Sequence, residues 1–136
     1  MFELTVEKTI AAAHYLRDYH GRCEQLHGHN YRIMVFLRGE ELDAAGMLVD
    51  FTEIKTALQP ILDHLDHTCL NDLPEFAEIS PSAENIARLI GDSLASNDFP
   101  RAIVHRVQVW ETPNQSATYF VPGKSGAMSL SQTSTV

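Results

Sequence analysis

The chain has 136 residues, of which 44% are hydrophobic and 21% are charged. This composition excludes a disordered chain and indicates a single domain with a real hydrophobic core. The formal net charge of -8 argues against nucleic acid as the main partner, and no hydrophobic run is long enough for a membrane-spanning helix.

The first half of the chain predicts two strands and a helix. Residues 2–14 alternate between hydrophobic and polar side chains, as in a half-buried strand, and residues 31–38 alternate again. Over residues 51–65 the hydrophobic positions recur every three or four residues, which is typical of an amphipathic helix. Asp50 is its expected N-cap, and Pro60 is expected to kink or interrupt it.

The next predicted element is a second helix. Residues 66–80 have the composition of a loop. Ser80 followed by Pro81 has the pattern of an N-cap and a first helical residue, and hydrophobic residues at helical spacing continue to Leu94.

Two more strands are expected, over residues 102–111 and 116–121. The order ββααββ indicates an α+β fold in which a four-stranded antiparallel sheet carries two helices on one face. From Pro122 the chain loses its periodicity, so we expect a single domain over residues 1–121 and a flexible tail over residues 122–136.

Three of the seven histidines are candidate metal ligands. His27 and His29 are two residues apart, so both side chains point to the same side of an extended backbone. His14 shares a face with the hydrophobic positions of the first strand, and a hairpin would bring all three to one end of the sheet on its covered side. Three neutral imidazoles with an open fourth position are a common catalytic zinc arrangement. The alternative is three loop histidines near the start of a strand.

Cys23 lies in the long linker between the first two predicted strands, and such linkers often carry function. Two cysteines without a secretory signal are no disulfide framework, and they predict a cytoplasmic protein. Beside a metal and histidines, a thiol can act as an acid, a base or a nucleophile. A fourth zinc ligand and an inert thiol are equal alternatives.

Two further candidates carry carboxylates. Asp66 could orient the imidazole of His67 for proton transfer, although a surface pair or a contact at the helix C-terminus is the alternative. Glu111 continues the hydrophobic face of the third predicted strand. It either pairs with a planar ligand that has adjacent N–H groups or reaches solvent at the rim.

Taken together, these residues resemble the 6-pyruvoyl-tetrahydropterin synthase superfamily over about residues 2–121. The resemblance is carried by Ala12-Ala13-His14, by Cys23 with His27-Gly28-His29-Asn30-Tyr31, by Leu65-Asp66-His67 with Leu70-Asn71, by Pro81-Ser82-Ala83-Glu84-Asn85, and by Val109-Trp110-Glu111-Thr112. The three-residue gap between Cys23 and His27 is similar to the bacterial 6-carboxytetrahydropterin synthase branch, which makes a queuosine precursor.

The resemblance implies a role for each site residue. The three histidines would bind Zn²⁺, which would hold and acidify the side-chain hydroxyls of the substrate, 7,8-dihydroneopterin triphosphate. Cys23 would be the general base, and Asp66 with His67 would form the relay for the second proton. Glu111 would bind the amino-pyrimidine edge of the pterin by paired hydrogen bonds, together with backbone groups near Ser82 and Ala83, and would also join the relay.

The implied reaction is a zinc-dependent carbon–carbon lyase reaction that yields 6-carboxy-5,6,7,8-tetrahydropterin, acetaldehyde and triphosphate. The first alternative is a 6-pyruvoyl-tetrahydropterin synthase, which eliminates triphosphate but keeps the side-chain carbons. The second is a zinc-binding module without turnover. A generic zinc hydrolase ranks last, because it gives no reason for Cys23, Asp66-His67 and Glu111 to occur together.

The resemblance also implies an assembly. In the tunnelling fold (T-fold) of this family, the sheets of several subunits close into a barrel, which removes exposed strand edges. We therefore expect a homohexamer made of two trimers, with sites between subunits, so that Cys23 and Glu111 meet the ligand together with a neighbouring chain.

The charge is distributed unevenly along the chain. Residues 1–38 hold five Lys or Arg against four Asp or Glu, whereas residues 39–111 hold four against fourteen. A triphosphate therefore fits the near-neutral first segment. We hypothesise that some of the four cations of this segment closest to the proposed site contact the triphosphate, Arg22 first because it adjoins Cys23; the others are Lys8, Arg17 and Arg32.

Overall fold

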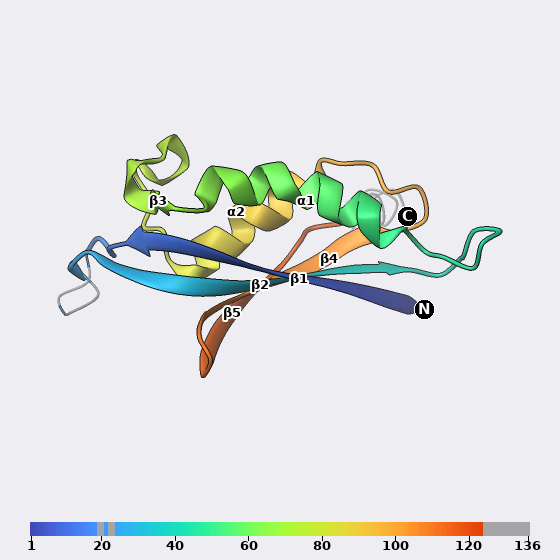
Figure 1. Ribbon diagram of the computed structural model, residues 1–136, viewed down its shortest axis with the longest axis horizontal. Helices are drawn as coiled ribbons and strands as arrows, with labels where there is room; N and C mark the ends of the chain where they lie inside the picture. The colour runs from blue at the N-terminus through green and yellow to red at the C-terminus, as the bar shows by residue number, and fades with distance from the viewer. Residues whose placement is uncertain (19–20, 22–23, 124–136) are drawn as a thin grey trace, which may run out of the picture.

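A computed structural model describes residues 1–18, 21 and 24–123 of the chain. Two helices lie on one face of a twisted sheet (Figure 1). The elements in chain order are β1 (Phe2–His14), β2 (His27–Gly39), α1 (Phe51–Leu65), β3 (Thr68–Cys69), the 3₁₀ turns η2 (Leu70–Asp72) and η3 (Pro74–Phe76), α2 (Ala83–Ala95), β4 (Ile103–Thr112) and β5 (Gln115–Phe120).

The sheet has the strand order β3-β1-β2-β4-β5. β1 and β2 form an antiparallel hairpin whose register runs from Phe2 opposite Gly39 to His14 opposite His27. β4 and β5 form a second antiparallel hairpin, which pairs with β2 through β4. The α+β class and the placement of both helices on one face are therefore confirmed.

The sheet has five strands, so the prediction of four was wrong. The extra strand, β3, has only two residues and pairs parallel to the end of β1, with Thr68 beside Ala12 and Cys69 beside Ala13. Two residues are too few to show an alternating pattern, which is why residues 66–80 have the composition of a loop. β2 also begins four residues earlier than expected, so His27 and His29 lie on the strand itself.

α1 starts and ends as the sequence indicates. Asp50 is its N-cap and accepts a hydrogen bond from the N–H of Thr52 at 2.9 Å. Pro60 lies inside the helix without interrupting it, so the prediction of an interruption was wrong. Pro60 and Thr56 are both exposed, so water can bond to the Thr56 carbonyl that the proline leaves without a partner.

α2 begins at Ala83, so the assignment of Ser80 and Pro81 to its start was wrong. Ser82 is the N-cap, and its hydroxyl accepts a hydrogen bond from the N–H of Asn85 at 3.2 Å. Ser80 is used elsewhere, because its hydroxyl accepts a hydrogen bond from the N–H of Arg17 at 2.8 Å. The loop before α2 is therefore bound to the end of β1.

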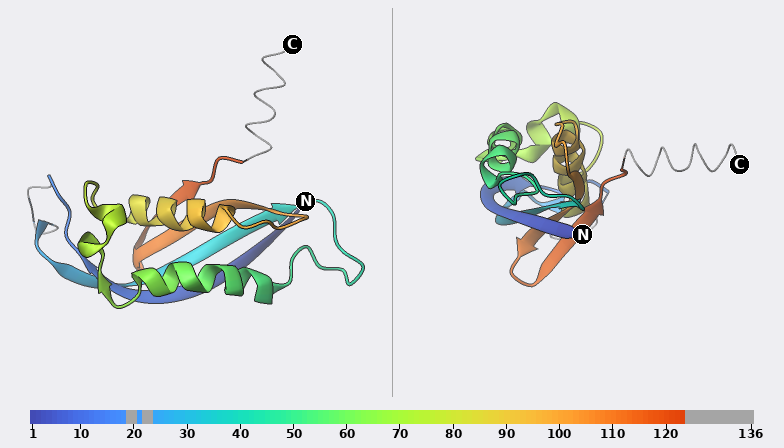
Figure 2. Two further views of the ribbon diagram at one scale, coloured as in Figure 1. Left: turned by 90° about the horizontal axis from the view of Figure 1, so that it is seen from above. Right: turned by 90° about the vertical axis from the view of Figure 1, so that its right-hand side faces the viewer.

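The hydrophobic core lies between the helices and the sheet. The two helices run side by side along the long axis of the molecule (Figure 2). Both contribute one hydrophobic face, and the strands contribute alternate residues; fully buried members include Ile33, Val35, Leu37, Ile54, Leu58, Leu65, Ile86, Ile90, Leu94, Val107 and Val109.

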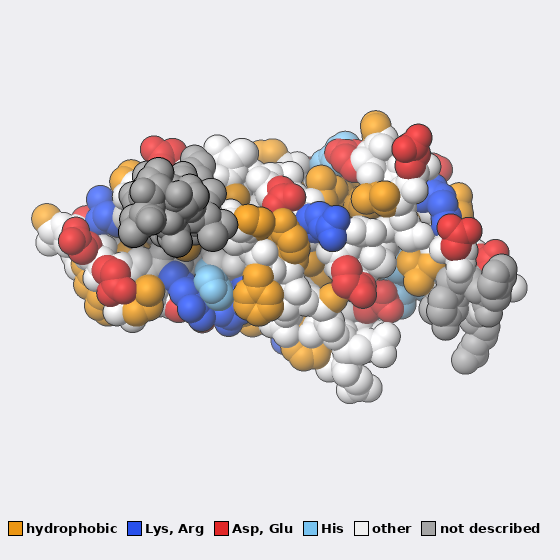
Figure 3. Space-filling model, turned by 180° about the vertical axis from the view of Figure 1, so that it is seen from behind, with side chains coloured by type: hydrophobic (Ala, Val, Ile, Leu, Met, Phe, Trp, Pro, Cys, Tyr) orange, Lys and Arg blue, Asp and Glu red, His pale blue; other side chains and the backbone are white. Residues whose placement is uncertain are grey.

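Charged side chains of both signs are interspersed on the face turned away from the view of Figure 1 (Figure 3). Within the described part of the chain, no helix combines the length and the hydrophobicity needed to cross a membrane.

Candidate functional site

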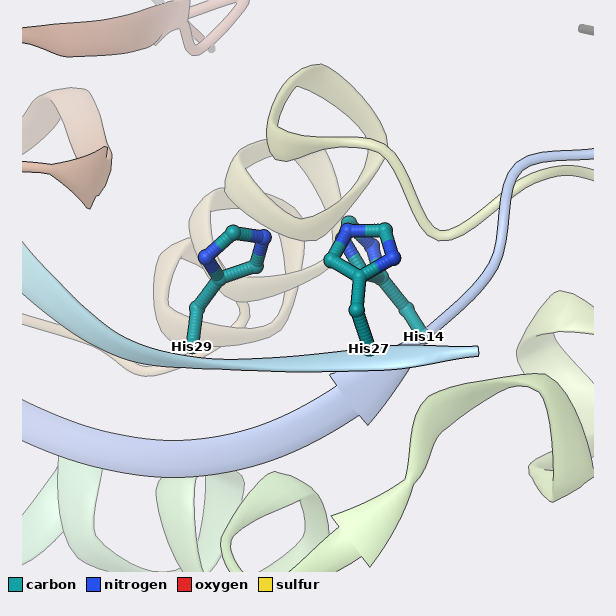
Figure 4. Close-up of side chains that lie close together, drawn as sticks. All are labelled: His14, His27 and His29. Carbon is teal, nitrogen blue, oxygen red and sulfur yellow. The ribbon is translucent and has the colours of Figure 1, made fainter. Parts of the chain in front are cut away.

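Three histidines converge at one end of the β1–β2 hairpin (Figure 4). His14 is the last residue of β1 and lies opposite His27, the first residue of β2. His29 follows two residues later on the same face of β2. Each ring offers one nitrogen, and these three nitrogens all lie within 4.8 Å of one another. The structure thus brings together the histidines that strand alternation placed on one face.

Two of these imidazoles are held in a defined tautomer. Nδ1 of His14 donates a hydrogen bond to the carbonyl of Pro81 at 2.6 Å, and Nδ1 of His27 donates to the carbonyl of Gln25 at 2.7 Å. In a neutral ring the proton is then on Nδ1, so Nε2 carries a lone pair.

The Nε2 atoms of His14 and His27 face each other at 2.9 Å. Nε2 of His29 is buried and has no hydrogen-bond partner among the described residues. Lone pairs that point at one another repel unless a proton or a cation lies between them. Three such nitrogens are suitable ligands for Zn²⁺. The backbone carbonyls that bind Nδ1 of His14 and His27 are the kind of partner that orients a metal-binding histidine.

Burial of His14 and His29 favours the neutral form of these two rings, which is the form that binds a metal. His14 is 1% exposed, and burial lowers its pKa below the usual value. Burial likewise lowers the pKa of His29, while the nearby Glu111 carboxylate opposes the shift in both rings.

Glu111 lies at the rim of the histidine cluster, on β4. Its carboxylate oxygens are 4.0 Å from Nε2 of His14 and 3.8 Å from Nε2 of His29, and its side chain is 20% exposed. Gln115 donates a 3.4 Å hydrogen bond to the same carboxylate. A partly open carboxylate beside a metal site can accept hydrogen bonds from a bound ligand and can also move a proton.

Asp66 and His67 lie apart from the cluster, directly before the edge strand β3 and beside β1. Asp66 accepts a hydrogen bond from the N–H of Ala11 at 2.8 Å, and its carboxylate is 3.0 Å from Nδ1 of His67. The imidazole of His67 is 82% exposed.

His67 lines a shallow hollow of about 490 Å³ whose wall also includes Ala11, Gly28, His29 and Asn30. Gly28 and Asn30 alternate along β2 with the histidines, so their side-chain positions lie on the opposite face of the sheet. The structure therefore forms the Asp66–His67 pair but does not bring it to the histidine cluster within one chain.

Ser82 and Ala83 lie at the start of α2, directly after Pro81, whose carbonyl binds His14. This places the N-terminus of α2, where backbone N–H groups lack partners within the helix, beside the histidine cluster. Glu111 and this helix terminus both adjoin His14.

Several predicted residues have other surroundings or lie outside the described part. Cys23 and Arg22 are outside the described residues, as are residues 124–136 of the predicted tail. Arg32 stacks on Trp110, 4.7 Å from its ring centroid. The guanidinium of Arg17 donates hydrogen bonds to two backbone carbonyls, those of Phe76 and Ile79, at 2.7 and 2.8 Å.

Two residues at the site were not singled out as functional from the sequence. Tyr31 is fully buried next to His14 and His29, and its hydroxyl has no hydrogen-bond partner among the described residues. Its position two residues after His29, on the same face of the strand, was the available signal. Asn71 is 7% exposed, and only its long-range contacts identify it.

Comparison with known proteins gives consistent matches over most of the chain. A family model described as 6-pyruvoyl tetrahydropterin synthase matches residues 3–122. A 6-carboxy-5,6,7,8-tetrahydropterin synthase from Synechocystis is 36% identical over 127 residues, which cover 90% of this chain and 95% of that protein. A Bacillus subtilis protein of the same name is 33% identical, with coverages of 92% and 88%.

Relatives of a second kind also match. Human 6-pyruvoyl tetrahydrobiopterin synthase is 35% identical over 103 residues, which cover 73% of this chain and 70% of that protein. Among solved structures, the Caenorhabditis elegans 6-pyruvoyl tetrahydropterin synthase is similar with a TM-score of 0.76 and 30% identity, and the match covers 89% of this chain and 97% of that one.

Proposed function

The chain belongs to the 6-pyruvoyl tetrahydropterin synthase family, and we propose that it is a zinc-dependent lyase within it. The proposed reaction converts 7,8-dihydroneopterin triphosphate into 6-carboxy-5,6,7,8-tetrahydropterin, acetaldehyde and triphosphate, as a step toward queuosine. The observation that carries the proposal is the convergence of three imidazole nitrogens beside a carboxylate, at the start of α2.

His14, His27 and His29 would hold the zinc ion. When bound, Zn²⁺ would supply Lewis-acid chemistry, stabilising negative charge on the substrate's side-chain oxygens. The tautomers of His14 and His27 support this role, because their Nδ1 protons are already committed to backbone carbonyls.

Glu111 would bind the pterin and orient it. A carboxylate accepts two parallel hydrogen bonds from an amino-pyrimidine edge, as it does from a guanidinium group. Backbone groups at Ser82 and Ala83 lie on the other side of His14 and would add donors for the same ring system. This arrangement fixes the substrate's side chain over the histidine cluster.

Proton transfer would fall to Cys23 and to the Asp66–His67 pair. The carboxylate of Asp66 lies 3.0 Å from Nδ1 of His67 and would hold that ring with Nε2 free to exchange a proton. Because this pair is far more exposed than the histidine cluster and faces outward, we propose that it serves the site of a neighbouring subunit. A homohexamer of two trimers, with the sheets closed into a barrel, would provide such a neighbour.

The choice of the carboxy product over the pyruvoyl product depends on two observations. Cys23 and His27 are separated by three residues, as in the bacterial branch. In sequence, the Synechocystis and Bacillus subtilis 6-carboxy proteins match over 95% and 88% of their own length, against 70% for the human and 79% for the Drosophila melanogaster 6-pyruvoyl protein. The fold does not separate the two branches, because the Caenorhabditis elegans 6-pyruvoyl structure matches over 97% of its length.

The deciding experiment is incubation of zinc-loaded protein with dihydroneopterin triphosphate, followed by mass analysis of the products. Release of acetaldehyde with a 6-carboxypterin supports the proposal, whereas a product that keeps the side-chain carbons would establish the 6-pyruvoyl activity instead. Protein stripped of zinc is the control.

A Cys23→Ala variant separates the remaining alternatives. Normal zinc binding with lost turnover would exclude a non-catalytic zinc module, and loss of zinc would show that Cys23 is a ligand. For the triphosphate, an unchanged KM in Arg22→Ala would refute the choice of Arg22.

A further inference from the structure

The end of β1 has a backbone partner that is not a strand. β1 pairs with β2 as far as His14, but on its other edge the pairing with β3 stops at Ala13. Tyr15, the next residue after His14, therefore has no strand partner on that edge. The direction in which His14 projects depends on what holds this last stretch of backbone.

The side chain of Asn71 takes the place of the missing strand. Its Oδ1 accepts a hydrogen bond from the N–H of Tyr15 at 2.9 Å, and its Nδ2 donates to the carbonyl of Tyr15 at 3.0 Å. One carboxamide thus offers the donor and the acceptor that a neighbouring strand residue would offer. Both bonds are partly buried, so water competes for them poorly.

The same loop also holds the ring of His14. Asn71 lies near the start of the loop, and Pro81, whose carbonyl accepts from Nδ1 of His14 at 2.6 Å, lies at its end. The middle and the end of the loop are bound to Arg17, whose guanidinium donates to the carbonyl of Phe76 and whose N–H donates to the hydroxyl of Ser80. The loop between α1 and α2 therefore binds both the backbone next to His14, at Tyr15, and the His14 imidazole.

We propose that Asn71 is a positioning residue for the metal site: by pairing with Tyr15, it aims Nε2 of His14 at His27 and His29. This inference rests on the proposed zinc site. Partners that orient a ligating histidine without touching the metal typically contribute about 10- to 100-fold to metal affinity. His27 is oriented separately, by the carbonyl of Gln25.

The test compares two amide-to-acid substitutions. Asn71→Asp keeps the acceptor for the Tyr15 N–H but turns the donor into an oxygen that faces the Tyr15 carbonyl. Asn97→Asp is the matched control, because the carboxamide of Asn97 also donates to backbone carbonyls, at 3.1 Å to Leu94 and 3.5 Å to Ser93, at the other end of α2.

The readouts are zinc affinity, measured by chelator competition, and the visible absorption of the Co²⁺-substituted protein, which reports ligand geometry without turnover. We expect Asn71→Asp to lower zinc affinity about 10- to 100-fold and to alter the Co²⁺ spectrum, with Asn97→Asp matching wild type in both. An unchanged affinity and spectrum in Asn71→Asp would overturn the inference.

Two further measurements distinguish a failure of the variant to fold, and a failure of the proposed metal site, from a failure of the role of Asn71. If Asn71→Asp fails to fold, Asn71→Ser, which keeps a small donor and acceptor, must show a weaker loss of the same kind, and wild-type affinity in that variant refutes the proposal. If wild-type protein itself binds no zinc, or His29→Ala binds it equally well, the proposed metal site fails rather than the role of Asn71.

Discussion

The histidine cluster and the Asp66–His67 pair carry the same kind of side chain in opposite surroundings. His14 is 1% exposed, and its imidazole is held by the hydrogen bond that Nδ1 donates to the carbonyl of Pro81. His67 is 82% exposed and has φ of 58°, a left-handed conformation rare for a residue other than glycine.

The difference separates the proposed metal ligands, which one chain brings together, from the proposed proton-transfer pair, which it leaves apart from them. The cluster gathers all its nitrogens from one hairpin, so we expect one chain to supply all three histidine ligands of the proposed metal. The exposed pair is well formed internally, with Asp66 bound to the backbone of Ala11, but its imidazole faces outward. This exposure is the reason for the proposal that the pair serves the site of a neighbouring subunit.

The largest expected effect is on turnover. In zinc-loaded protein, His67→Ala should lower kcat by about 10²- to 10⁴-fold, the usual contribution of one general acid or base. Zinc content, measured by metal analysis, should stay at the wild-type level because His67 lies outside the cluster. Full activity of this variant would show that the exposed pair has no part in the reaction.

The second effect is on zinc affinity, which should depend on the histidine cluster and not on the Asp66–His67 pair. His29→Ala should weaken zinc binding more than about 100-fold, beyond what the loss of an outer-shell partner costs. Asp66→Asn should leave zinc affinity at the wild-type value. Chelator competition on both proteins checks this, and weakened binding in Asp66→Asn would contradict the separation drawn here.

A smaller but more specific effect is expected from mixed assemblies. His29→Ala and His67→Ala chains, denatured together and reassembled, should regain part of the wild-type activity, because some interfaces then join an intact cluster to an intact pair. Reassembly of His27→Ala with His29→Ala chains is the control and should stay inactive. If the first mixture is also inactive, the pair does not act across subunits.

The smallest effect concerns stability against pH. The N–H of Ala11, and after it His67, hold the pKa of Asp66 below its usual value of 3.8. A carboxylate with a lowered folded-state pKa stabilises the fold above its unfolded-state pKa, and this contribution is lost as the pH falls through the folded-state value.

Asp66→Asn should therefore be less stable than wild type at pH 6, and the gap should narrow as the pH falls below about 4. Thermal unfolding at a series of pH values measures this gap. A gap of the same size at pH 3 and pH 6 would assign the effect to lost packing instead of charge.

The sequence predicted the fold well wherever a periodic pattern was long. β1 and α1 are found at residues 2–14 and 51–65, as expected, because each has several repeats of its hydrophobic period. β3 and the start of β2 were missed. His27-Gly28-His29-Asn30 contains no hydrophobic residue, and β3 contains only two residues, so neither has a period to detect.

The candidate site also has a part that local sequence patterns predicted and a part that they did not. The identity of the three histidines followed from alternation along two strands, which assigns each side chain to a face regardless of its type. The loop contacts did not follow, because Ser80 is used to bind Arg17, 63 residues away, rather than to cap the nearby helix. The sequence pattern favours Ser80 as a helix cap, but its hydroxyl binds the N–H of Arg17 instead.

The sequence by itself determined the α+β class, the inward face of each long strand and the three residues that share that face at one end of the sheet. These properties depend on the two-residue repeat of an extended chain, which is local. Only the tertiary structure decided that two of the imidazoles carry their proton on Nδ1, that Asn71 and Pro81 hold His14, and that Asp66–His67 faces away. Those outcomes depend on contacts across 55 to 67 residues of chain, and no local pattern records such contacts.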